Sequence, residues 1–232
     1  MNGKSTGNLV YLSHYLGTDT PMYANEGQVM RIPLKCLDHG DTANLERWSL
    51  NNHSGTHIDL PAHFFSDGNR LEDYPPDFFM AENICWIDLS DNCHSGKIID
   101  IEDLQMFSPD PATEVLLLKT GYERYRGSQT YWNENPGFAD TLADYLRRTL
   151  PALRFLGFDS LSLTSYQDRA LGKAAHRAFL GTQRPILLIE DMKLSSLESG
   201  CKINKISIVP LLFSRAEGSP VTVIAEIEIQ RA

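Results

Sequence analysis

The chain has 232 residues, enough for one large domain or two small ones, and its 42% hydrophobic and 22% charged residues are typical of a globular protein in water. A net charge of -9 argues against nucleic acid as a partner, because phosphate binding needs a basic face. The apolar runs are all short, such as Val115–Leu118, so the sequence predicts no membrane partner.

No Ser/Gly run, Pro-rich tract, charge block or internal repeat divides the chain, so we predict a single domain over residues 1–232. The cysteines form no CxxC pair and fit no zinc-finger spacing, which favours reduced, structural thiols. The segment Met1–Gly7 is polar and lacks the apolar stretch of a secretory signal. These features together predict a cytoplasmic protein.

The predicted elements before residue 53 are two short strands and a turn-rich stretch. Residues 9–13 have the pattern of a short strand, and a turn-rich stretch follows over 16–21, with Tyr23 in the loop after it. Residues 43–51 alternate between two sets of side chains, which predicts a strand that leads into the next segment.

That next segment, residues 53–63, contains three histidines and an aspartate at odd-numbered positions: His53, His57, Asp59 and His63. In an extended chain alternate side chains face the same way, so these groups line one edge. Neutral imidazole nitrogen and carboxylate oxygen are the usual protein ligands of zinc, iron and manganese. The pattern therefore predicts a metal site rather than a row of solvated histidines.

The spacing of this row restricts its geometry. A straight strand would separate His53 from His57 by about 13 Å, at or beyond the reach of two side chains that share one ion through bonds of about 2.0–2.1 Å. Either the backbone bends at Gly55, which is permissive for it, or two metals lie along the edge. Pro61 ends strand pairing and places His63 in a loop.

The remaining chain alternates strands and helices, which predicts an α/β protein. Phe64 and Phe65 open a turn next to the histidine row and are candidates for an apolar pocket wall. The patterns predict strands over 83–89, 114–119, 154–158 and 185–190, helices over 101–104, 138–150 and 168–180, and a final strand pair over 206–213 and 218–225 joined by a Gly-Ser-Pro turn.

Glu190 ends the apolar run 185–190, an unusual position for a carboxylate. A buried carboxylate without a partner is costly, and a metal ion would satisfy it. His176, within the predicted helix 168–180, supplies another imidazole in the same half of the chain.

The segment His53–His63 matches the pattern H-x-G-T-H-x-D-x-P-x-H at every specified position. In this it resembles the cyclase family of metal-dependent hydrolases, which includes bacterial kynurenine formamidases and isatin hydrolases. His176, Glu190 and the segments 119–122, 159–162 and 218–225 are similar to later motifs of that family. The resemblance extends from about Leu9 to the C-terminus.

The resemblance implies a swivelling β/β/α-type α/β fold, with a mixed twisted sheet and packed helices, usually in a homo-oligomer (a dimer or tetramer). It also implies one or two divalent ions per subunit, zinc or manganese, with Asp59 and Glu190 contacting both ions of a binuclear site. The implied ligands are His53, His57, Asp59, His176 and Glu190. By the same resemblance Tyr23 is a pocket wall.

We expect hydrolysis of a carbon–nitrogen bond in a small-molecule amide, such as N-formylkynurenine or another N-formyl aryl amide, by metal-activated water. His63, which follows the ligand row, is the expected general acid/base, because the unperturbed pKa of imidazole is about 6.5. The alternatives are ring opening or cyclisation of an isatin-like lactam with the same site, and a non-catalytic metal-binding scaffold.

Overall fold

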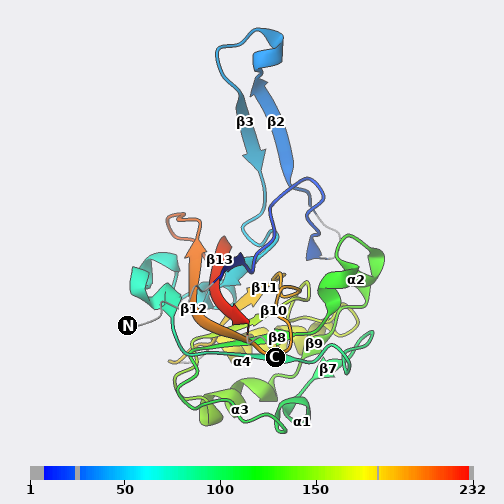
Figure 1. The fold of residues 1–232 in the computed structure, drawn as a ribbon, viewed down its shortest axis with the longest axis vertical. Helices are drawn as coiled ribbons and strands as arrows, with labels where there is room; N and C mark the ends of the chain where they lie inside the picture. The colour runs from blue at the N-terminus through cyan, green and yellow to red at the C-terminus, as the bar shows by residue number, and fades with distance from the viewer. Residues whose placement is uncertain (1–7, 24–26, 182, 230–232) are drawn as a thin grey trace.

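A large mixed sheet forms the centre of the computed structural model, which describes residues 8–23, 27–181 and 183–229 (Figure 1). The strand order is β5 (Met80–Ala81), β12 (Cys201–Pro210), β13 (Gly218–Ile229), β4 (His57–Asp59), β11 (Leu187–Glu190), β10 (Phe155–Phe158), β8 (Val115–Lys119) and β6 (Ile84–Asp88). Outside this path, β1 (Asn8–Tyr11) pairs with β13. The predicted mixed α/β fold is confirmed.

The sheet joins a parallel half to an antiparallel half. β6, β8, β10 and β11 run parallel, whereas β4 pairs antiparallel with both β11 and β13. The indole Nε1 of Trp86 in β6 donates to the carbonyl of Cys201 in β12 at 2.8 Å, so the sheet curls until it nearly closes. Because β4 pairs with β11 on one side and with β13 on the other, it is the strand at which the parallel and antiparallel halves meet.

The parallel strands form the core, and helices cover one side of them. Val115–Leu118, Phe155–Phe158 and Leu187–Glu190 are buried throughout, as their continuous apolar runs predict. Helices α1 (Ile101–Leu104), α3 (Thr141–Thr149) and α4 (Arg169–Leu180) lie on the lower side in Figure 1, whereas α2 (Gln129–Asn133) lies apart from them. A short parallel pair, β7 (Ile98–Ile99) with β9 (Gly137–Phe138), lies off the main sheet.

A hairpin of β2 (Met30–Lys35) and β3 (Leu45–Ser49) projects from this body (Figure 1). Every residue of both strands is exposed. The strand predicted over 43–51 is thus present as β3, which ends at Ser49, shortly before His53. β3 pairs with β2 in a separate sheet, and residues 50–56 lie between it and β4.

Several boundaries differ from the sequence prediction, among them the start of β12, which lies at Cys201. The helix predicted over 138–150 begins at Thr141, because the Asp140 side chain accepts from the Thr141 N–H at 2.9 Å and Phe138 pairs in β9 instead. The Gly-Ser-Pro segment is strand rather than turn: Gly218, Ser219 and Pro220 pair with β4, and the chain reverses over 211–217. Among the helices that the structure describes, none combines the length and apolar character needed to cross a membrane.

Candidate metal centre

Gly55 bends the histidine segment. Its φ of +63° lies in the left-handed region, and a Cβ there would lie 2.6 Å from Leu16 Cδ2, so both backbone and space favour glycine. Only His57–Asp59 is strand, and the bend folds His53 back until its ring centroid lies 5.1 Å from that of His57. Of the two alternatives for this spacing, the bend at Gly55 is the one that the backbone adopts.

β4 and its neighbour β11 bring three of the predicted ligands together. His57 and Asp59 are two residues apart on one strand and share a face, whereas Ile58 between them is fully buried in the core. Glu190, the last residue of β11, lies directly opposite His57 in the antiparallel pairing. The register of two adjacent strands therefore joins positions that are 133 residues apart.

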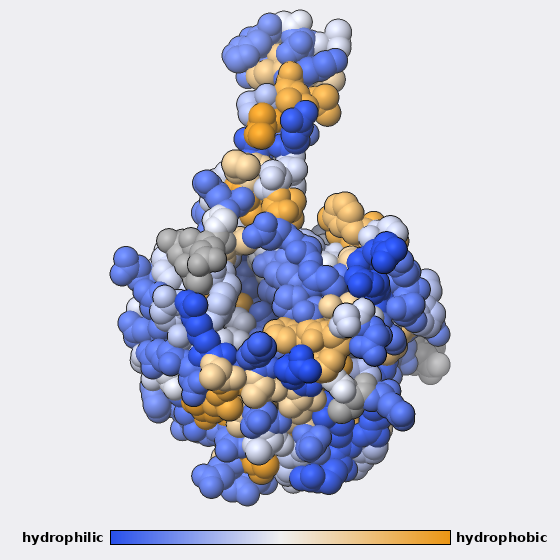
Figure 2. Space-filling view, turned by 180° about the vertical axis from the view of Figure 1, so that it is seen from behind, coloured by the Kyte–Doolittle hydropathy of each residue, from blue (hydrophilic) through white to orange (hydrophobic). Residues whose placement is uncertain are grey.

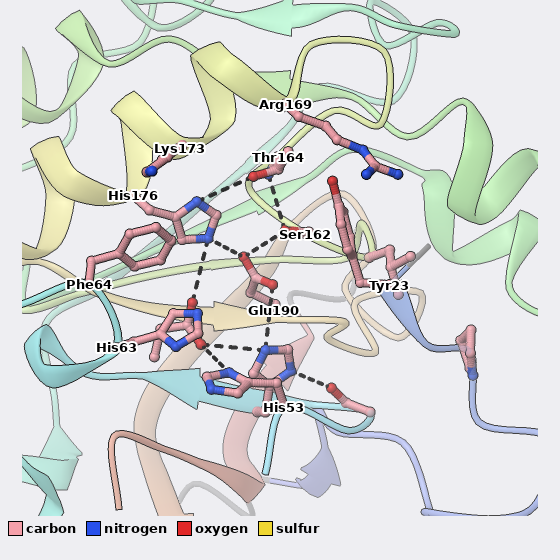
Figure 3. A pocket seen from close by; sticks show the side chains of 15 residues that line it. Tyr23, His53, His63, Phe64, Ser162, Thr164, Arg169, Lys173, His176 and Glu190 are labelled. Carbon is pink, nitrogen blue, oxygen red and sulfur yellow. Dashed lines mark hydrogen bonds and ion pairs between the residues drawn. The ribbon is translucent and has the colours of Figure 1, made fainter. Parts of the chain in front are cut away.

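The His57 and His176 imidazoles both direct Nε2 towards the carboxylates, and Figure 3 shows His176 beside Glu190. His57 Nδ1 bonds the Gly55 carbonyl at 2.7 Å, and His176 Nδ1 bonds the Gly172 carbonyl one helical turn earlier at 2.8 Å. Because a carbonyl oxygen only accepts, each Nδ1 carries the proton. Each Nε2 is then the atom that can bind a metal.

The distances among these atoms fit a metal ion. His57 Nε2 lies 3.5 Å from Asp59 Oδ1 and 3.5 Å from Glu190 Oε2, and His176 Nε2 lies 3.5 Å from Asp59 Oδ2 and 3.4 Å from Glu190 Oε1. Ligand atoms bonded to one ion at about 2.1 Å in tetrahedral geometry lie about 3.4 Å apart. The same contacts are longer than ordinary hydrogen bonds.

Burial makes a cation necessary in this cluster. His57, Asp59, His176 and Glu190 are all at most 5% exposed. Burial lowers the pKa of the His176 imidazole, but its contacts with Asp59 and Glu190 outweigh burial and raise the pKa to about 10. Burial raises the pKa of Asp59, whereas its contacts with the imidazoles of His176 and His53 hold the pKa well below its usual range. Positive charge from protons or from a metal ion is what stabilises these carboxylates, so metal binding would release protons.

Glu190 and the residue after it are held firmly. The Glu190 Oε1 atom accepts from the Leu163 N–H at 2.7 Å and from the Ser162 hydroxyl at 3.3 Å. Asp191 has a φ of 51°, and its carboxylate takes a two-pronged contact from Arg126, with Nε at 3.0 Å and Nη2 at 2.9 Å. These bonds orient the Glu190 carboxylate where β11 ends.

His53 and His63 share a carboxylate, Glu217, that sequence reasoning missed. Glu217 Oε2 accepts from His53 Nε2 at 2.9 Å and from His63 Nδ1 at 2.7 Å, while the other ring nitrogen of His53 lies 2.8 Å from Asp59 Oδ1. Burial lowers the pKa of His53, but Asp59 and Glu217 raise it to about 10. Burial raises the pKa of Glu217, and its two histidine partners hold it below its usual range.

The one local signal for this contact is the glycine that follows Glu217. A Cβ on Gly218 would lie 2.3 Å from the His53 ring, so this position must be glycine for the imidazole to approach. Three overlapping groups of potential ligands result: His53 with His57 and Asp59, Asp59 with His176 and Glu190, and His53 with His63 and Glu217. Asp59 belongs to the first two groups and His53 to the first and third.

A cavity of about 440 Å³ opens beside these groups. Tyr23 and Phe64 line it, and the Phe64 ring stacks on His176 with centroids 4.8 Å apart. Phe65 is not part of this lining. Its ring packs beneath the Arg177 guanidinium at 4.4 Å and close to Gly181, because neighbouring residues of this turn point in different directions.

Similar proteins share most of this chain. A kynurenine formamidase of Bacillus cytotoxicus is 28% identical over 187 residues, which cover 81% of this chain and 82% of that protein. Cyclase-like protein 3 of Oryza sativa subsp. japonica is 24% identical over 230 residues, with 94% and 79% covered. The structure of an isatin hydrolase bound to thioisatinate superposes with a TM-score of 0.79 at 17% identity over 96% of this chain and 92% of that one, which shows a common fold.

The family model described as "Putative cyclase" matches residues 10–164, well over half of the chain. That range contains the whole segment 53–63 with its ligand pattern, whereas His176 and Glu190 lie beyond it and join the cluster through the fold. The chain belongs to the cyclase family.

Proposed function

We propose that this protein is a metal-dependent hydrolase that cleaves the carbon–nitrogen bond of a small amide. The observation that carries the proposal is the square of four contacts of 3.4–3.5 Å between two buried imidazoles and two buried carboxylates at the wall of a cavity. The hydrolase names of its relatives support the same chemistry.

Asp59, His176 and Glu190 would hold one divalent ion, and His53, His57 and Asp59 would hold a second, with Asp59 shared between them. This mixture of imidazole and carboxylate suits zinc or manganese. When bound, such an ion polarises the carbonyl of a substrate and lowers the pKa of a water molecule to about 7.

His63 would transfer the proton. Its Nδ1 donates to Glu217, so its Nε2 is the nitrogen that can accept and return a proton; Nε2 makes no hydrogen bond with any residue that the structure describes. It would take a proton from the attacking water and deliver it to the departing nitrogen, which an amide needs because an amide anion is a poor leaving group. Glu217 fixes the tautomer and the ring orientation.

For the substrate we propose an N-formyl aryl amide such as N-formylkynurenine. The aromatic walls Tyr23 and Phe64 and a volume of about 440 Å³ suit a single aromatic ring with its substituents. The kynurenine formamidase relative supports this class. The second candidate is ring opening of an isatin-like lactam, which the fold shared with isatin hydrolase favours.

Formanilide, N-formylkynurenine and isatin, each assayed with protein loaded with zinc or manganese, separate these candidates. We expect release of formate from the formyl amides and loss of that activity on chelation, with recovery when metal is restored. Ring opening of isatin alone would move the assignment to the second candidate. Tight metal binding without hydrolysis of any of the three would indicate a non-catalytic scaffold instead.

We also propose a homodimer in which the projecting hairpin packs on a second copy. Met30 and Ile32 are two residues apart on β2 and share one face, and Leu34 follows at the register shift between Pro33 and Lys35. The three side chains are 45%, 40% and 47% exposed. Figure 2 shows apolar side chains along this hairpin. An isolated two-stranded hairpin is marginal in water, so burial of this face against another subunit would stabilise it.

The body of the protein offers a matching surface. Val209, Leu211, Leu212 and Phe213 are 50–81% exposed at the end of β12 and just beyond it. A twofold dimer would let each hairpin cover this surface on its partner.

The double variant Ile32→Glu/Leu34→Glu should sediment as a monomer in analytical ultracentrifugation, because four charges would enter the interface of the dimer. Asp38→Asn at the exposed tip of the hairpin should leave the dimer intact. A wild-type protein that is monomeric at micromolar concentration, or a double variant that still dimerises, would contradict this arrangement.

A further inference from the structure

Two cationic side chains line the cavity on the side of α4. Arg169 and Lys173 are four residues apart, and His176 follows three residues later, so all three lie on one face of the helix. All three line the cavity together with the carboxylates Asp59 and Glu190 (Figure 3). The same helix face therefore carries one predicted metal ligand and two positive charges.

Neither cation has a carboxylate partner among the described residues. The Arg169 guanidinium instead lies against two aromatic rings, 4.5 Å from the Tyr166 centroid and 5.8 Å from that of Tyr23. The adjacent Asp168 caps the helix and accepts from the Leu171 N–H at 3.0 Å. Arg169 and Lys173 are both exposed, so their charges at the cavity are available to a ligand.

Within the part of the chain that the structure describes, Arg169 and Lys173 have no negative partner in the charge balance of the cavity. One divalent ion would balance Asp59 and Glu190, and the hydrogen bonds that hold Glu217 come from His53 and His63 rather than from Arg169 or Lys173. A second ion would add further positive charge. With metal bound, the wall formed by Arg169 and Lys173 is therefore uncompensated and attracts a negative charge.

We propose that Arg169 and Lys173 bind an anionic group of the substrate, a carboxylate, so that the enzyme selects acid-bearing amides over neutral ones. The inference rests on the proposed hydrolase function and specifies its substrate class. The planar guanidinium, held by Tyr23 and Tyr166, presents a fixed pair of donors, and the Lys173 ammonium adds a mobile point charge. The scissile amide would then lie at the metal centre and the carboxylate at α4.

Three N-formylaminobenzoates, with the carboxylate ortho, meta or para to the formamide, test this selection against the three corresponding carboxamides. Each acid and its carboxamide have nearly the same shape and differ in charge. With metal-loaded wild-type protein, we expect at least one acid to exceed its carboxamide about tenfold or more in kcat/KM.

Lys173→Met and Arg169→Gln should each lower kcat/KM for that acid by about 10- to 100-fold, mainly through KM, and change the carboxamide by no more than about twofold. Metal content should be unchanged in both variants. Arg148→Gln, at an exposed position of α3, makes the same change in net charge and should affect neither substrate. This control removes a general effect of protein charge.

The binding of the aminobenzoate products to metal-loaded protein, measured by calorimetry, provides a readout independent of turnover. Affinity should fall about tenfold or more in Lys173→Met. Carboxamides hydrolysed as fast as acids, variants that impair both substrates equally, or product affinity unchanged in Lys173→Met would each overturn the anion site, while hydrolysis itself would leave the hydrolase function standing. Absence of hydrolysis with every substrate, together with product binding that depends on Lys173, would refute the hydrolase and retain the anion site.

Discussion

Replacement of Asp59 by asparagine should remove metal from both proposed sites and reduce turnover about a thousandfold or more. Asp59 is the one side chain shared by the two metal groups built on β4: Oδ1 faces His53 at 2.8 Å and His57 at 3.5 Å, and Oδ2 faces His176 at 3.5 Å. An amide has nearly the same shape but only one neutral ligand oxygen, and its nitrogen would point at an imidazole.

Elemental analysis of dialysed protein, together with kcat for a formyl amide, checks this expectation. Glu190→Gln should act on one group alone, because Glu190 belongs with Asp59 and His176 but not with His53. If two ions bind, this second variant should retain about half of the metal; if one ion binds, it should retain little. Asp67→Asn, a change at an exposed carboxylate, should retain full metal and activity. Full metal content in Asp59→Asn would remove Asp59 from the ligand set.

Replacement of His63 by alanine should leave the metal in place and lower kcat by about 100- to 10,000-fold, the range expected for loss of a general acid/base. His63 lies outside the square of four contacts, and its Nδ1 is bound to Glu217 at 2.7 Å. Its ring centroid lies 4.1 Å from that of His53, with the two rings tilted by 36°, and 6.5 Å from that of His176, close enough to serve a substrate held at the metal.

The required readouts are metal content, kcat and KM, with added imidazole as a chemical rescue. Glu217→Gln should produce a milder loss of kcat, about tenfold, because the histidine remains but its tautomer and orientation are less fixed. His39→Ala removes an exposed imidazole from the hairpin and should change nothing. Release of metal from His63→Ala would reassign His63 as a ligand, and an unchanged kcat would exclude it from proton transfer.

Much of the fold follows from local pattern. Continuous apolar runs predicted β8, β10 and β11, because a strand buried on both faces needs apolar residues at every position. The start of α3 was misplaced by three residues, since a capping interaction and a distant strand partner for Phe138 competed with the helical periodicity. The hairpin strand β3 was recognised, but its separation from the main sheet was not, because pairing partners are a property of the folded chain.

In the candidate site, too, some features follow from local sequence and others depend on the tertiary fold. Residues 53–63 are close in sequence, and the permissive backbone of Gly55 made the bend a possibility that could be named in advance. The contact of Glu217 with His53 and His63 spans more than 150 residues and depends on how closely β13 approaches β4. Closeness in sequence misled the prediction for Phe65. It neighbours Phe64 in sequence, yet its ring turns away from the cavity towards Arg177.

The sequence by itself determined the chemistry available to this protein: the set of imidazoles and carboxylates, the glycine that bends the segment, and the α/β pattern of the chain. Only the tertiary structure decided which of those groups meet. The register of β4 against β11 places Glu190 opposite His57, and the packing of α4 brings His176, Arg169 and Lys173 to one cavity. The physical reason is that residue types and short-range spacing set local conformation, whereas distances between remote side chains depend on strand pairing and helix packing that involve the whole chain.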